Sequence, residues 1–372
     1  MKKILAFILA VSMTAAFSGC NSEKNSNSET TTSAAETQSE TVSETVGENI
    51  SENTSESDSE STSARQDENS ETKFILEYPA DVQAMGYTEP VVLDKAPERV
   101  VCLSTAPVLA LYELGVNMVG VPNSMVVSWP EDLKNNAATV SFSVMSPEDF
   151  DYESVVALEP DLVMLSAVGA ETAGEKLESF GIKCYYLNAG HTVSYESIKM
   201  QTKALIDAFD QTDEAKKAGE EIMQRFSDLE ASIANAKTAF SGKTVMVLQG
   251  SADSQYIQTS GGTLGSMLDM IGFENVFTNE GSSMVQLNYE EALDYNPDYV
   301  VCVGSTDAQT HKATMDGVFA SNPEYWNAIP AVAEGKVICL DVTYVSTAGI
   351  NVIDNIANLI GIMSENTGIK VE

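Results

Sequence analysis

Two glutamates, Glu153 and Glu290, occupy the same position in a pattern that the sequence contains twice. The copies run over residues 152–163 and 289–300, and they share Tyr, Glu, Pro, Asp and Val at the same offsets. An Asp or Asn precedes each copy as the expected N-cap, and the proline stops the helix just before an apolar run. The pattern predicts a helix, a turn and a strand in each of two similar lobes. The chemistry open to the glutamates is electrostatic, and its simplest form is stabilisation of the helix dipole by about 0.3–1 kcal/mol.

Side chains suited to catalysis or metal binding are scarce. An enzyme needs a base, a nucleophile and an orienting group, or an open metal site. The chain has two histidines, His191 and His311, and it lacks CxxC, GxSxG and HExxH patterns, so we expect no enzyme. A receptor for free zinc or manganese would gather several histidines and carboxylates, and it is disfavoured for the same reason. The chain has four cysteines besides Cys20: Cys102, Cys184, Cys302 and Cys339. They are best interpreted as buried free thiols, with a disulfide between neighbouring strands as the alternative.

The elements that position these side chains alternate along residues 73–372. Val- and Ile-rich runs alternate with amphipathic helices, which predicts an α/β fold of two doubly wound, Rossmann-like lobes with a ligand cleft between them. We expect the N-terminal lobe over 73–211 and the C-terminal lobe over 241–372. Apolar residues at three- and four-residue steps over 212–240 predict one long interlobe helix of roughly 40 Å. Strands are expected at 100–104, 116–121, 162–166, 183–187, 243–249 and 336–341, and helices at 107–115, 171–180, 263–271 and 350–364.

The front of the chain predicts export and tethering. Two lysines precede an apolar stretch in residues 1–19, which is too short to span a bilayer and is typical of a secretory signal peptide. Small residues directly before Cys20 resemble the lipobox of bacterial lipoproteins, in which this cysteine is lipidated; the alternative is an ordinary cleaved signal. Residues 20–72 are almost entirely Ser, Thr, Glu, Asn and Gln, which predicts a disordered tether. The formal net charge of -35 argues against nucleic acid or anionic lipid as a partner.

Several short motifs, in their order along the chain, resemble a known family: the substrate-binding proteins of ABC importers of the ferric siderophore, haem and vitamin B12 class, which carry the Fe/B12 periplasmic-binding domain. The similarity covers residue 96 to the C-terminus. Each motif is weak alone, but their order and the long interlobe helix make the likeness specific. The motifs are PERVVCLS at 97–104, ALEPDLV at 157–163, LESFGI at 177–182, GFENV at 272–276 and VAEGKV at 332–337.

The resemblance implies a partner and a location. In this family one surface glutamate per lobe binds arginines of the membrane permease, and the matching positions here are Glu153 and Glu290, with Glu159 and Glu291 as weaker candidates. A rigid two-lobed body must present complementary charge to a two-fold permease at matched places, so the assignment is physically reasonable. We expect a monomer that is anchored to the outer face of the cytoplasmic membrane only through its lipid, in a Gram-positive envelope. A surface adhesin or sensory module would explain the tether but not the matched glutamates.

The ligand is expected at the carboxyl ends of the strands, where open parallel sheets bind small molecules. Only three arginines are present, which disfavours a ligand with many carboxylates and shifts the expectation toward a corrinoid or a more neutral chelate, with haem as the alternative. The protein itself should need no cofactor, although His191 or His311 would be the axial ligand if one binds the metal of a chelate. Each candidate has a local packing or hydrogen-bonding role as its alternative. The candidates are Ser104, Thr105, Trp129, Ser166, His191, Gln249, Tyr256, Met284, Ser305 and Tyr344.

Overall fold

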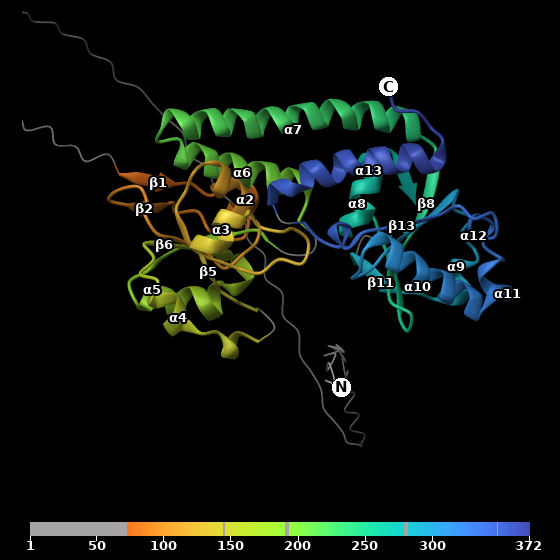
Figure 1. Cartoon of the computed structure of the whole chain (residues 1–372), viewed down its shortest axis with the longest axis horizontal. Helices are drawn as coiled ribbons and strands as arrows, with labels where there is room; N and C mark the ends of the chain where they lie inside the picture. Colours follow the sequence, from red (N-terminus) through yellow and green to blue (C-terminus); the bar gives the residue numbers. More distant parts are fainter. Residues whose placement is uncertain (1–72, 144–145, 190–192, 279–281, 348) are drawn as a thin grey trace, which may run out of the picture. The chain divides into compact units, whose positions relative to one another are not determined.

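The computed structural model describes residues 73–143, 146–189, 193–278, 282–347 and 349–372. Cys20, the signal segment, the tether and His191 lie outside these residues. Figure 1 shows two sheet-containing parts of the described chain, with one long helix running along both. We call them the first lobe and the second lobe, according to the order of their sheets in the sequence.

The sheet of the first lobe has five strands in the order β5-β4-β3-β6-β7, and every neighbouring pair is parallel. Four consecutive residues of β6, Leu162 to Leu165, have no exposed surface, as expected of a parallel strand that helices cover on both faces. This is the doubly wound arrangement that the sequence predicts. The strands are β3 (Val100–Cys102), β4 (Met118–Val121), β5 (Ala138–Thr139), β6 (Leu162–Ser166) and β7 (Lys183–Leu187).

The helices of the first lobe follow its strands in the expected alternation. A π-helical turn, η3, continues directly into α5, where the sequence predicts a single helix at 171–180. They are α2 (Val108–Glu113), α3 (Glu131–Asn136), η1 (Pro147–Asp149), α4 (Tyr152–Val156), η2 (Ala167–Gly169), η3 (Ala170–Gly174), α5 (Glu175–Ser179) and α6 (Tyr195–Phe209).

A small antiparallel sheet precedes this lobe. Its two strands were not predicted, because each offers only three residues to a pattern analysis. Phe74 and Leu76 are buried on one face of the first strand and Ile75 is exposed on the other. The elements are β1 (Phe74–Leu76), α1 (Ala80–Gln83) and β2 (Val91–Leu93).

The sheet of the second lobe contains parallel strands and an antiparallel extension. β12 is parallel to β8 and β13, and β10 is parallel to β8, whereas β9 and β11 are antiparallel to their neighbours. No strand was predicted between residue 249 and the helix at 263–271, because β9 has the sequence QYIQ and no apolar run. The strands are β8 (Lys243–Gly250), β9 (Gln255–Gln258), β10 (Phe273–Asn275), β11 (Met284–Gln286), β12 (Tyr299–Val303) and β13 (Val337–Leu340).

Helices cover both faces of this second sheet. Val245 and Val247 of β8 belong to one apolar cluster, and Met246 and Leu248 belong to another on the opposite face. The helices are α8 (Thr263–Met270), α9 (Tyr289–Ala292), α10 (Ala308–Ser321), α11 (Pro323–Trp326), α12 (Pro330–Ala333), η4 (Val342–Tyr344), η5 (Gly349–Asn351) and α13 (Val352–Thr367).

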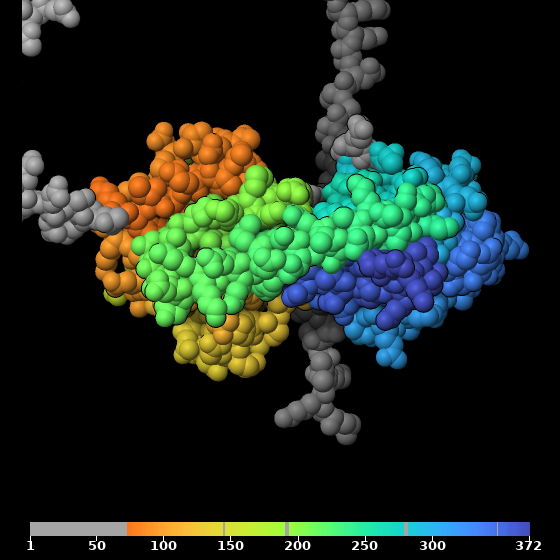
Figure 2. Space-filling model, turned by 90° about the horizontal axis from the view of Figure 1, so that it is seen from above, coloured from red at the N-terminus to blue at the C-terminus, as the bar shows by residue number. Residues whose placement is uncertain are grey.

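Helix α7 (Asp213–Phe240) connects the two lobes with 28 helical residues, about 40 Å at 1.5 Å per residue. The Thr212 side chain caps it by accepting a hydrogen bond from the amide of Ala215. Figures 1 and 2 show α7 lying lengthwise beside α13, and it contacts α2 and α6 of the first lobe as well. One continuous helix therefore packs against elements of both lobes.

The chain returns to the first lobe before its last helix. Turn η5 packs against α2 and α6, and α13 then runs along α7. Gly349 has φ +65°, and a Cβ atom there would overlap the carbonyl oxygen of Ala106. A glycine is required because the backbone is left-handed and lies directly against another chain segment.

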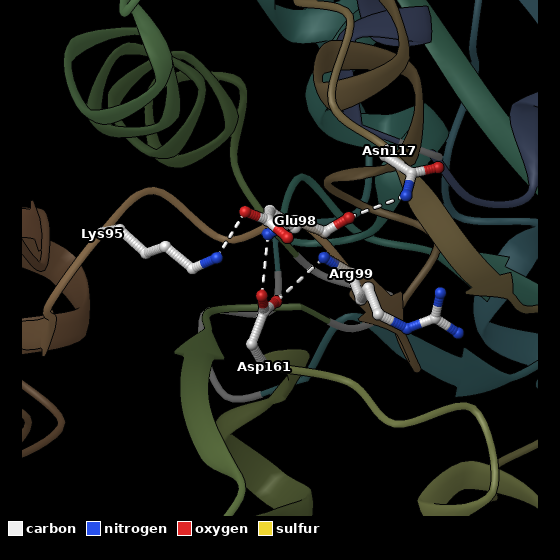
Figure 3. Close-up of polar contacts among 5 residues, drawn as sticks. All are labelled: Lys95, Glu98, Arg99, Asn117 and Asp161. Carbon is white, nitrogen blue, oxygen red and sulfur yellow. Dashed lines mark hydrogen bonds and ion pairs between the residues drawn. The ribbon is translucent and has the colours of Figure 1, made fainter.

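The aspartate of the repeated pattern joins each helix-turn-strand unit to the neighbouring strand, and Figure 3 shows Asp161 of the first lobe. The carboxylate of Asp161 accepts hydrogen bonds from the amides of Glu98 (2.8 Å) and Arg99 (3.0 Å), just before β3. In the second lobe the carboxylate of Asp298 accepts one from the amide of Thr244 (3.0 Å), at the start of β8. Each aspartate amide also donates to the neighbouring strand, at 3.1 Å in both lobes. The helix thus ends before the proline, which prevents its continuation, and the aspartate ties the start of the next strand to its neighbour.

Removing this carboxylate is predicted to destabilise the fold. We expect Asp161→Ala to lower the free energy of unfolding by about 1–3 kcal/mol, because two backbone amides lose a charged acceptor. Asp161→Asn, which keeps one acceptor oxygen, should lose less. Denaturant unfolding followed by circular dichroism measures both.

Asp94 is the matched control, since it is exposed and has no hydrogen bond to another described residue. Equal stability of Asp161→Ala and Asp94→Ala would show that the carboxylate of Asp161 contributes nothing to the fold.

Candidate functional site

A cavity of about 500 Å³ lies at the carboxyl ends of the first-lobe strands. Residues that follow β3, β4, β6 and β7 form its walls, helix α6 forms another side, and the segment before α13 completes it. Parallel sheets bind small molecules at this edge, because the loops that leave the strands converge there. The lining includes Ser104, Thr105, Asn123, Ser166, Asn188, Gln201, Ser346 and Gly349.

Three of the residues predicted to contact a ligand line this cavity together: Ser104, Thr105 and Ser166. The Ser166 hydroxyl donates to the carbonyl of Ala189 at 2.9 Å, which ties the end of β6 to the loop after β7. The Ser104 hydroxyl accepts from the amide of Ala106 at 3.3 Å. Both side chains hold the loops that shape the cavity.

Four other predicted residues lie in the second lobe, and none of them lines this cavity. Gln249 and Tyr256 are paired across β8 and β9. Met284 is 37 % exposed in β11, and Ser305 is exposed just after β12. The unpredicted strands β9 and β11 thus place two of them, Tyr256 and Met284, in the antiparallel extension.

The two candidate residues Trp129 and Tyr344 are packed in the interior. Trp129 is 6 % exposed, and its Nε1 donates to the carbonyl of Pro122 at 2.6 Å beside a smaller cavity of about 280 Å³. Tyr344 is 4 % exposed, and burial raises its pKa to about 12. Both rings have the packing roles that the sequence analysis gave as the alternative.

His311 is buried in the first turns of α10. Its side chain is 2 % exposed, and its Nε2 has no hydrogen-bond partner among the described residues. Gly304 leaves the space that the ring occupies, and burial lowers the pKa of the imidazole. The ring is therefore held neutral inside the second lobe and is closed off from the cavity.

A polar network beside the cavity was missed by the sequence analysis. The Ser197 hydroxyl donates to the carboxylate of Asp81, and Asn188 Nδ2 donates to the same carboxylate at 3.0 Å. Gln201 Nε2 donates to the Ser197 hydroxyl and to the carbonyl of Asn188, both at 2.9 Å. The available signal was the spacing of Ser197 and Gln201, which lie one turn apart on the buried face of α6.

The cavity carries no ionisable side chain among the described residues that line it. Arg99 lies elsewhere, and its guanidinium donates to the carbonyl oxygens of Leu158 (2.6 Å) and Glu159 (3.2 Å) at the end of α4. Arg225 pairs with Glu113. The described part of the chain also lacks any group of three or more His, Cys, Asp or Glu side chains arranged to hold a metal ion.

The two glutamates of the repeated pattern are exposed in equivalent helices. Asp151 caps α4 and Asn288 caps α9, each through a side-chain oxygen. Neither Glu153 nor Glu290 makes a side-chain hydrogen bond or ion pair with another described residue. Each helix also exposes an apolar residue three positions later, on the same face. These residues are Val156 (37 % exposed) and Leu293 (44 % exposed).

The thiols of the described cysteines are free. Cys102, Cys184 and Cys302 are buried, and Cys339 is half-buried. Cys302 and Cys339 are direct partners on β12 and β13, and a hydrogen bond from Cys302 lowers the pKa of Cys339. The free thiols agree with the first of the two interpretations drawn from the sequence.

A family model described as periplasmic binding protein matches residues 100–344, from β3 through η4. The chain belongs to the periplasmic binding protein family. This membership confirms the class predicted from the sequence motifs: a substrate-binding protein of an ABC importer, and not an enzyme. It also agrees with the two-lobed α/β fold. Within the described residues, every helix is too short or too polar to cross a bilayer.

Individual relatives of this periplasmic binding protein are distant. The chain is 26 % identical over 216 residues to the vitamin B12-binding protein of Photorhabdus laumondii, covering 57 % of this chain and 73 % of the relative. It is 23 % identical over 245 residues to the high-affinity heme uptake system protein IsdE of Staphylococcus aureus, covering 65 % and 79 %. A periplasmic binding protein from Veillonella parvula has a similar fold, with a TM-score of 0.62, 19 % identity, and coverage of 81 % of this chain and 100 % of that one.

The burial of His311 predicts a pH-dependent stability. Its pKa in the folded protein lies below the ordinary value of 6.5, so the unfolded chain binds the proton more readily. Stability from this group is complete above about pH 6.5 and falls as the pH drops further. We expect the free energy of unfolding to decrease less between pH 7.5 and 5.5 in His311→Gln than in the unsubstituted protein.

Urea unfolding at the two pH values measures this difference. Acidic side chains contribute equally to both proteins and cancel in the comparison. Identical decreases in the two proteins would contradict a neutral, buried imidazole.

Proposed function

We propose that this periplasmic binding protein captures a metal chelate outside the cytoplasmic membrane and delivers it to an ABC permease. The observation that carries the proposal is the family match over residues 100–344, with a cavity at the carboxyl ends of the first-lobe strands inside the matched region. A protein of this kind binds and releases its ligand unchanged. The absence of a catalytic set of side chains around the described cavity fits that role.

The proposed ligand is a corrinoid or a ferric siderophore, and haem is the second candidate. Relatives named for vitamin B12 and for heme uptake are similar to this chain at comparable identity, 26 % and 23 %. Their names support a chelate with a large organic frame. The metal belongs to the ligand, and the protein needs no cofactor of its own.

The proposed contact with the permease is made by Glu153 and Glu290. Their carboxylates are exposed and unpaired within the described structure, so basic side chains of a partner can bind them without breaking an existing ion pair. Val156 and Leu293 add an exposed apolar group at the same offset from each glutamate. A polar rim around an apolar centre is the usual composition of a protein interface.

The proposed location is the outer face of the cytoplasmic membrane of a Gram-positive cell. Cys20, with small residues directly before it, would carry the lipid, and the polar segment up to residue 72 would hold the binding domain away from the bilayer. The protein is proposed to act as a monomer, with the permease as its macromolecular partner.

Charge reversal tests the docking contact. We predict that Glu153→Lys together with Glu290→Lys lowers ligand uptake by at least about tenfold, since two attractions become repulsions at the interface. Ligand affinity of the purified protein should stay unchanged, because both residues lie outside the cavity. Uptake is measured in cells that depend on this receptor.

The matched control is Glu220→Lys with Glu365→Lys, which makes the same charge change on exposed residues of α7 and α13, outside both repeated units. Full uptake by the Glu153/Glu290 double variant, or equal loss in the control, would refute docking through these two residues.

Ligand titration tests the receptor function itself. We expect cyanocobalamin, cobinamide, haemin or a ferric siderophore to raise the melting temperature and to be recovered unmodified. A ligand at one hundred times its Kd stabilises the folded state by about 2.7 kcal/mol. A compound that is chemically altered by the protein would exclude a simple receptor.

A further inference from the structure

Two cysteines face each other across neighbouring strands of the second-lobe sheet. Cys302 of β12 and Cys339 of β13 are direct partners in the parallel register, and β13 is an edge strand of that sheet. Neighbouring strands in a sheet lie about 4.8 Å apart. The Cα atoms of disulfide-bonded cysteines lie about 4.4–6.8 Å apart, so this pairing suits a bond between the two sulfurs.

The two thiols lie on the same face of the sheet. Cys302 belongs to the apolar cluster beneath α10, together with Met315 of that helix, and Cys339 packs against the same cluster. The next residues along the two strands, Val303 and Leu340, belong to the cluster on the opposite face. The thiol of Cys302 donates a hydrogen bond to the sulfur of Cys339. The two sulfurs are therefore in contact before any bond forms between them.

The pair is asymmetric in access and in acidity. Cys302 has no exposed surface, whereas Cys339 is half-buried on the edge strand. The hydrogen bond from Cys302 and the ammonium group of Lys312 lower the pKa of the Cys339 thiol, and they outweigh the opposing effects of burial and of the Asp316 carboxylate. The same hydrogen bond and burial raise the pKa of Cys302. Because thiol–disulfide exchange starts at an accessible thiolate, Cys339 is the attacking group and Cys302 the resolving one.

The two cysteines of the first lobe have no such partner. The Cys102 thiol is hydrogen-bonded to the sulfur of Met118 at 3.8 Å, and the Cys184 thiol to the carbonyl of Gly174 at 3.9 Å. Their register partners on β6 are not cysteines. Both thiols are buried, and burial raises the pKa of each. They are internal controls for the reactivity of the second-lobe pair.

We infer that Cys302 and Cys339 form a reversible thiol–disulfide site, which reacts with small disulfides and in its oxidised form cross-links β12 to the edge strand β13. The Cys339 thiolate attacks one sulfur of the small disulfide, and the first half of that molecule leaves as a thiol with the proton of Cys339. The sulfur of Cys302 then attacks that of Cys339, and the second half leaves as a thiol with the proton of Cys302. Two protein thiols are oxidised, and one disulfide is reduced to two thiols.

Peptide mapping tests the cross-link. The full chain is equilibrated with oxidised glutathione, alkylated under denaturing conditions and digested with trypsin, which separates these four cysteines into different peptides. We expect one disulfide-linked pair, residues 244–312 with residues 337–370, while Cys102 and Cys184 are alkylated as free thiols. Dithiothreitol added before the alkylation should remove the linked pair, because the exchange is reversible.

Single serine variants test the two roles. In Cys302→Ser a glutathione mixed disulfide should accumulate on Cys339, because no resolving thiol is present. In Cys339→Ser the buried Cys302 should react with glutathione disulfide at least about tenfold more slowly than Cys339 does in the first variant. Cys184→Ser is the matched control: it removes a buried cysteine outside the pair and should leave the cross-link unchanged. Thermal unfolding checks that each variant folds.

The cross-link should also stabilise the fold. We expect the melting temperature of the oxidised protein to exceed that of the reduced protein by at least about 3 °C, because a bond between residues 302 and 339 restricts the unfolded chain. In Cys339→Ser the oxidising and reducing conditions should give the same melting temperature.

Three results would overturn the inference: free thiols at both Cys302 and Cys339 after full oxidation, equal reaction of the two thiols in the single serine variants, or a melting temperature that oxidation leaves unchanged. None of these results bears on chelate binding, so the proposed receptor function would stand. Conversely, failure of every chelate to bind would leave the thiol pair as it is.

Discussion

The fold depends on a carboxylate that binds the backbone at the entry of a neighbouring strand. Asp161 and Asp298 each follow a proline that ends a short helix, and each accepts hydrogen bonds from the chain just before, or at the start of, the adjacent strand. The first paired residues of those strands, Val100 with Leu162 and Val245 with Tyr299, follow directly. This interaction therefore ties the start of each strand to its neighbour and thereby places the preceding helix against the sheet. The exposed glutamates have equivalent positions in the two lobes because the same anchoring occurs in both.

The elements that the sequence predicted correctly are those whose structure is decided by residues close together in the chain. Strands β6 and β7 begin and end at the residues expected, because buried parallel strands are continuous apolar runs. The helix at 213–240 lies where the apolar period placed it, since its buried face repeats over many turns. The repeated units were recognisable because N-cap, helix, proline and aspartate are all close in sequence, and each has a local structural consequence.

The cavity at the first-lobe strand ends was harder to predict, because contacts between residues far apart in sequence form it. β9 consists of glutamines around Tyr256 and Ile257, and it is a strand because it pairs with β8 and because Gln258 accepts from the first amides of α8. Trp129 was named as a candidate for ligand contact, and in the structure its ring is buried and its Nε1 donates to the carbonyl of Pro122. Gln201 looks like an ordinary helix residue until Ser197 and Asp81, far apart in sequence, fix its orientation. Residue type alone does not encode such networks.

The chain is strongly acidic, whereas the described residues that line the cavity carry no ionisable side chain. The formal charge of -35 produces a field that repels anions at long range, and the described residues that line the cavity include no cationic side chain. The two described arginines are both engaged elsewhere, one by helix-terminal carbonyls and one by Glu113. Unpaired charge is kept instead at Glu153 and Glu290, outside the cavity. The acidic charge is therefore carried outside the described lining of the cavity, on surfaces such as those of Glu153 and Glu290.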